Sequence, residues 1–166
     1  MQKTSLRMTK ASPRPLQQEA AAEIRHFSLR DLLPSHHLLA LNLTLGTLAQ
    51  LACEEGLPRL VAEQQFTNSE ICVLLPLLEA YPHYCPYEVL LASFINGHIT
   101  EAEIERCRRR LSLAQAEGVW DQEMRPVRNV LSRTRMKLYT FGIDIFSILE
   151  TGYVLMRRTR QRPSGG

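Results

Sequence analysis

The sequence has four cysteines and five histidines, the residue types that most often bind metals or form disulfides. No CxxC pair occurs, and His83 and Cys85 supply at most half of a zinc-type ligand set. Because the cysteines are irregularly spaced and no secretory signal precedes them, a disulfide framework is not expected either. We therefore predict no metal site and no structural disulfide.

The sequence contains no recognisable set of catalytic residues. We find no phosphate-binding glycine loop, no nucleophile motif and no pair of carboxylates with a reason to lie together. His36 and His37 follow Ser35 and are interpreted as a loop or a helix start. The sequence thus predicts a protein that is not an enzyme and that needs no cofactor.

Basic residues are concentrated in the last quarter of the chain. Residues 125–166 contain nine lysines and arginines against two acids, Asp144 and Glu150, a net charge of +7, whereas the whole chain carries only +3. Such a basic segment can bind a polyanion. The alternative at this point is a solvated basic tail.

The elements that would position these cations are a helix and a β-hairpin. Residues 126–139 place Val127, Leu131, Thr134 and Leu138 on one helical face, which leaves the cations on the other. Residues 143–149 alternate as a strand does, and residues 153–156 return after the turn at Gly152.

Three helices are expected upstream. Thr67 and Glu70 form a capping box before an apolar run over 71–78, and Thr100 and Glu103 form a second one before a helix over 100–116. Between them, Pro86 suits the first turn of a helix over 87–94. Gly118 is expected to end the third helix.

The N-terminal part is harder to interpret. We predict a disordered basic arm over 1–14, a helix over 16–26, and helices over 35–54 and 57–64. Leucines alternate with smaller residues over 39–45, as in a strand, but the stretch continues into a segment of helical propensity. The predicted fold is therefore mainly α with a small C-terminal hairpin: a winged helix-turn-helix over 66–156, preceded by a helical region over 15–65 and followed by a disordered basic tail over 157–166.

The motifs of the C-terminal part resemble a known family. Val127, Leu131, Arg135, Lys137 and Leu138, followed by the Ile145 to Tyr153 hairpin, are similar to the recognition helix and wing of OmpR/PhoB-type effector domains. The segment Phe66–Leu78 resembles the first helix of that family, and Pro86–Leu91 its second. We expect no receiver domain, because residues 1–65 are too short for one.

The resemblance and the helical pattern together imply a set of DNA-contacting residues. Base edges or the groove would be contacted from helix 126–139 and its start, phosphates by Arg135 and Lys137, and further contacts would come from the wing and tail. The complete predicted set is Arg125, Arg128, Asn129, Val130, Ser132, Arg133, Arg135, Lys137, Ser147, Arg157 and Arg158.

Three features depart from the family pattern. A helix is inserted before the recognition helix, and its arginines would contact DNA, a partner or only solvent. Leu149 and Glu150 stand where the wing favours a basic residue and glycine, which predicts a weakly binding wing. Asn129 and Thr134 occupy positions that are usually apolar.

The predicted function is a bacterial-type transcriptional regulator that binds duplex DNA, located in the cytoplasm with the nucleoid and without a membrane partner. The leucine-rich region 32–62 would form a homodimer or pack against its own domain. The alternative function is a protein-interaction module on a winged-helix frame, which docks RNA polymerase or another regulator.

Overall fold

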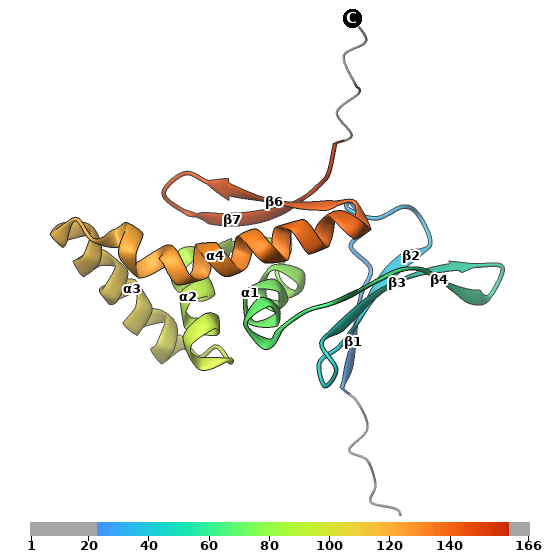
Figure 1. Ribbon diagram of the computed structural model, residues 1–166, viewed down its shortest axis with the longest axis horizontal. Coiled ribbons are helices and arrows are strands. Elements are labelled where there is room, and N and C mark those ends of the chain that lie inside the picture. The colour runs from blue at the N-terminus through green and yellow to red at the C-terminus, as the bar shows by residue number, and fades with distance from the viewer. Residues whose placement is uncertain (1–22, 160–166) are drawn as a thin grey trace, which may run out of the picture.

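The computed structural model describes residues 23–159, which form two antiparallel sheets and a group of helices around one core (Figure 1). The first half begins with strands β1 (Ile24–Phe27), β2 (His37–Asn42), β3 (Thr47–Glu54) and β4 (Leu57–Gln65). The helices are α1 (Asn68–Glu79), α2 (Tyr87–Asn96), α3 (Glu101–Glu117) and α4 (Trp120–Leu138). Strand β5 (Tyr84–Pro86) precedes α2, and a short 3-10 turn (Tyr139–Phe141) leads from α4 to β6 (Ile143–Ile148) and β7 (Gly152–Arg157).

Strands β1 to β4 pair in chain order, so each neighbour is reached by a short reversal of the chain. Leu39, Leu41 and Leu48 alternate with less buried residues and are themselves fully buried on the face that joins the core. Gly46 is required at the β2–β3 turn, because its φ is +70° and a Cβ there would lie 2.5 Å from the Phe66 carbonyl oxygen.

The predicted helices over 35–54 and 57–64 are therefore wrong. The period-two alternation of the leucines, which the sequence displays over 39–45, determines the structure there, and the helical propensity of the following residues does not. Paired strands bury one face of this segment, a gain that outweighs the small differences in local propensity.

The fold class is accordingly mixed, with seven strands and four α-helices in residues 23–159, and the prediction of a mainly α protein with a helical N-terminal region is wrong. Of the helix predicted over 16–26, residues 24–26 lie in β1 and residues 16–22 lie outside the described part. The predicted arm over 1–14 lies outside it too, as do residues 160–166 of the predicted tail.

Both predicted capping boxes are confirmed. Thr67 accepts a hydrogen bond from the Glu70 amide at 3.3 Å while the Glu70 carboxylate accepts one from the Thr67 amide at 3.1 Å. Thr100 and Glu103 repeat this arrangement at the start of α3. Each box satisfies amide donors that a helix start otherwise leaves unpaired.

Helix α4 begins earlier than predicted, at Trp120 and not at Pro126. Asp121 and Glu123 lie in its first turn, where a helix N-terminus favours acids. Pro126 is exposed within the helix, so its ring points away from the core while the helix continues past it.

The predicted C-terminal hairpin is confirmed within one residue at each end, and it belongs to a three-stranded sheet in the order β5-β7-β6. The pairing of β5 with β7 was not predicted, because three residues ending in a proline give little strand signal. The hairpin lies along one side of α4, and α1 and α2 lie on the other (Figure 1). Helix α4 is thus fixed between these elements with one face left outward.

Candidate nucleic-acid interface

A tight turn sets α4 against α3. Helix α3 ends at Gly118, whose φ is +71°, and the Gly118 amide bonds back to the carbonyls of Ala114 and Gln115. Val119 is the only other residue before α4 begins. The order along the chain here is therefore helix, short glycine-containing turn, helix and β-hairpin.

The inner face of α4 is buried against the core. The predicted inward residues Val127, Leu131, Thr134 and Leu138 are at most 3% exposed, which confirms their assignment. The buried Thr134 hydroxyl has a hydrogen-bond partner there, because it donates to the Val130 carbonyl at 2.8 Å. Val130, which was predicted to face a groove, is only 4% exposed and belongs to this inner face.

The outer face of α4 carries the exposed members of the predicted set: Arg125, Asn129, Ser132 and Arg133. Met136 continues the same stripe and is 69% exposed. Within residues 23–159, neither Arg125 nor Arg133 takes part in an ion pair. We name the stripe Arg125–Asn129–Ser132–Arg133–Met136 the outer stripe of α4.

Arg128 lies at the side of the outer stripe and is partly engaged. Its guanidinium bonds to Asp121 at 2.7 Å and lies 5.0 Å from the centre of the Trp120 ring. Trp120 and Tyr153 each pack edge-to-face on Tyr87, with ring centroids 4.9 and 5.6 Å away. The partly buried Tyr153 ring also packs against the core cluster.

Arg135 is held by the hairpin. Its guanidinium donates two hydrogen bonds to the Asp144 carboxylate on β6, which raises the pKa of Arg135. The Asp144 carboxylate is buried and also accepts from the Ile145 amide at 2.8 Å. No local pattern predicts this partner, since Asp144 stands in an otherwise ordinary strand.

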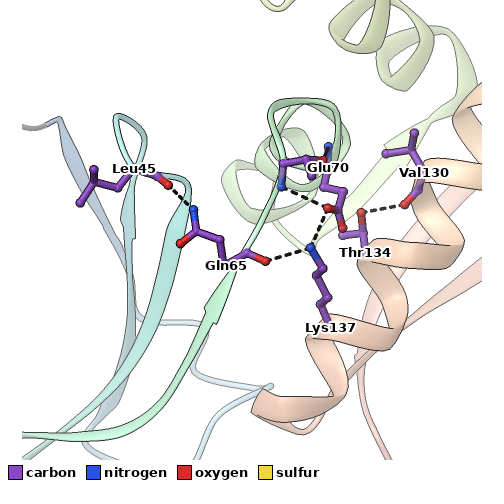
Figure 2. A network of polar contacts seen from close by, with 7 residues as sticks. Leu45, Gln65, Glu70, Val130, Thr134 and Lys137 are labelled. Carbon is purple, nitrogen blue, oxygen red and sulfur yellow. Dashed lines mark hydrogen bonds and ion pairs between the residues drawn. The ribbon is translucent and has the colours of Figure 1, made fainter.

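Lys137 reaches across to the end of β4 and the first turn of α1, as Figure 2 shows. Its ammonium donates to the Gln65 carbonyl at 2.9 Å and to Glu70 at 2.8 Å. Glu70 is 1% exposed, and its second carboxylate oxygen has no hydrogen-bond partner among the described residues. Burial alone would raise the pKa of Glu70, but the hydrogen bonds from Lys137 and Thr67 outweigh it and hold that pKa below its usual value.

The hairpin and the segment after it supply the other predicted residues. Ser147, Arg157 and Arg158 are all exposed. The Arg158 guanidinium lies 3.8 Å from the centre of the Tyr139 ring, and its amide bonds to the Gly142 carbonyl, so this cation is anchored beside the end of α4. Leu149 at the hairpin tip is 86% exposed, and Glu150 beside it has a φ of +62°.

A cleft of about 810 Å³ lies between α2, α3, the start of α4 and the hairpin tip. The aromatic rings of Tyr87, Trp120 and Tyr153 line it together with Arg108 and Arg128. Glu88 and Glu150 line it too, so its charged groups balance. The cleft therefore attracts neither anions nor cations strongly, unlike the outer stripe.

His83 and Cys85 are used within the fold. A ring nitrogen of His83 lies 3.0 Å from the Leu77 carbonyl oxygen, and the Cys85 side chain is buried in the core. Burial raises the pKa of the Cys85 thiol to about 12, so the thiol stays protonated at neutral pH. In residues 23–159 no three histidine, cysteine or acidic side chains gather in a way that would hold a metal ion.

Comparison with known proteins identifies no relative: no family model, curated protein or solved structure matches this chain. No helix within residues 23–159 has the length and apolar character to cross a membrane.

Proposed function

We propose that this protein binds duplex DNA as a transcriptional regulator, with α4 in the major groove. The observation that carries the proposal is the outer stripe of α4, where Arg125 and Arg133 are exposed and have no acidic partner in the described part of the chain. A helix fits the major groove, and its outward side chains meet base edges and phosphates there. The helix, turn, helix, wing order of α3, α4 and the hairpin supports the same docking.

The remaining cations would share the contacts with the backbone. Arg128 flanks the outer stripe, and its partner Asp121 is largely exposed, so the ion pair between them is readily exchanged for a phosphate. Arg157 at the end of β7 and Arg158 after it extend the basic surface. Lys137 and Arg135 instead bind acids of their own domain and mainly hold α4 in place.

The wing would add little affinity in this proposal. Its tip presents Leu149 and Glu150, and a carboxylate beside the phosphates is repelled by them. Binding as a homodimer would compensate for a weak wing, because two α4 helices then engage two half-sites at once.

The proposal is tested by fluorescence anisotropy of the full chain with a labelled random-sequence duplex. Binding is expected at low salt and should weaken steeply as salt increases. The double variant Arg125→Ala, Arg133→Ala should bind at least tenfold more weakly. Arg59→Ala, which removes an exposed arginine from β4, is the matched control and should bind like the wild type. Absence of salt-dependent binding by the wild type would overturn the proposal.

A second candidate function is favoured by a different observation. The hairpin exposes Phe146, Ile148, Leu149 and Met156, each at least 41% accessible, and exposed apolar groups of this kind mark protein interfaces. In this reading the winged-helix frame docks RNA polymerase or another regulator. Co-purification with that partner would then survive loss of Arg128, Arg133 and Arg135, whereas Leu149→Ser would weaken it.

A further inference from the structure

Three side chains of the outer stripe repeat at a fixed interval. Arg125, Asn129 and Arg133 are spaced by four residues, slightly more than one helical turn, and all three are exposed. They therefore project from the same side of α4 in a row. A row of this kind can meet bases at regular intervals if the helix lies along a groove.

These three side chains are also free to take up new partners. Among the described residues none of them makes a side-chain hydrogen bond or an ion pair, whereas Arg128, Arg135 and Lys137 each do. Binding DNA through the row therefore breaks no existing contact. For Arg135 or Lys137, the same binding would leave a buried carboxylate without its partner.

The chemistry of the row matches particular bases. An arginine guanidinium donates two hydrogen bonds to O6 and N7 of guanine, and an asparagine amide pairs with N6 and N7 of adenine. Lysine, serine and threonine lack this selectivity, and the row contains none of them. The hydrogen-bonding groups of the row, in chain order, therefore match a guanine, an adenine and a guanine.

We propose that α4 recognises a purine-containing half-site in which Arg125 and Arg133 each bind a guanine and Asn129 binds an adenine between them. This inference rests on the proposed DNA binding and adds its sequence preference. Four residues advance a helix by about 6 Å, close to two base-pair steps of about 3.4 Å. The three purines should therefore recur about two base pairs apart, on either strand, within the reach of one straight helix.

The experiment begins with selection of bound duplexes from a random-sequence library by the full chain. The recovered half-site should contain the two guanines with adenine between them at that spacing. A labelled duplex with the recovered site then serves in anisotropy titrations, together with duplexes in which each of the three base pairs is replaced in turn. Each replacement should weaken wild-type binding roughly 5- to 100-fold.

Variants assign each base to its side chain. Asn129→Ala should lose discrimination at the adenine only. Arg133→Lys keeps the positive charge but cannot form the bidentate pair of hydrogen bonds with guanine. It should therefore lose discrimination at one guanine while keeping the salt dependence. Arg59→Ala, at an exposed arginine of β4 that lies outside the outer stripe, is the matched control and should keep all three preferences.

The possible results separate this inference from the proposed function. If the wild type binds DNA with salt dependence but recovers no such site, or if Asn129→Ala leaves the adenine preference intact, the inference is wrong and the proposed function stands. If the wild type binds no duplex at all, both are wrong.

Discussion

The cations of α4 divide into two classes according to what holds them. Arg135 and Lys137 bind the buried acids Asp144 and Glu70, so they stabilise the position of the helix against the hairpin and α1. Arg125 and Arg133 are exposed and have no such acid within the described residues. Residues two positions apart on one helix therefore have separate roles, and the two roles can be measured separately.

Replacing Arg135 by alanine should reduce the free energy of unfolding, because the buried Asp144 carboxylate loses its two charged donors and keeps only the Ile145 amide. We expect a loss of about 1–3 kcal/mol, measured by urea denaturation. Arg133→Ala removes only an exposed side chain and should change the stability by less than about 0.5 kcal/mol. Equal stability losses for the two variants would contradict the division into two classes.

Glu70 should make stability depend on pH in the acidic range. Its pKa is held below the ordinary value of 4.5, so its ionised form stabilises the folded state at neutral pH. That contribution is present above pH 4.5 and is lost as the pH falls through the lower folded-state pKa. Urea midpoints from pH 7 to pH 3 should therefore decline more for the wild type than for Glu70→Gln, which has no carboxylate to titrate. Equal declines of the urea midpoint in the two proteins would show that the Glu70–Lys137 pair adds nothing to the stability of the folded state.

At the scale of the elements, the α3–α4 turn decides where the outer stripe points. Gly118 adopts a left-handed conformation, and open space surrounds it, so a substitution there acts through backbone strain and not through a clash. Gly118→Ala should cost about 1–2 kcal/mol of stability, and Gly118→Asn clearly less, because asparagine tolerates this conformation better. The comparison is made by urea denaturation, and equal stability of all three proteins would argue against a strained turn.

The helices and the hairpin could be predicted because their signals are local. The Thr67 and Thr100 capping boxes and the turn at Gly152 each act over a few residues, so the sequence alone places them. The N-terminal sheet depends instead on pairing between strands, such as Leu41 with Leu48, and propensity within one short segment does not report it.

The candidate site was predictable to a similar extent. Helical periodicity placed Arg125, Asn129 and Arg133 outward correctly, whereas the resemblance placed Val130 outward and the structure buries it. The acids that bind Arg135 and Lys137 lie on other elements. Asp144 is nine residues from Arg135 and Glu70 is 67 residues from Lys137, and no local pattern links either acid to α4. Long-range partners of this kind determine which cations of α4 are free to bind another molecule.

For the whole molecule, the proposed DNA complex has two separable parts: base contacts from the outer stripe of α4 and phosphate contacts from the basic segment at the end of the hairpin. Arg157 is the last residue of β7, Arg158 follows it, and both are exposed, so they should neutralise phosphates without touching bases. Each phosphate contact contributes about −0.9 to the slope of log affinity against log salt.

The double variant Arg157→Gln, Arg158→Gln should therefore make that slope less steep by about 2 and weaken binding to all sequences alike. The measurement is anisotropy of one selected and one random duplex at several salt concentrations. Arg133→Lys is the complementary control, because it should leave the slope unchanged while reducing the preference for the selected duplex. A double variant that loses the preference but keeps the slope would mean that these two arginines contact bases, and the division between the helix and the basic segment would be wrong.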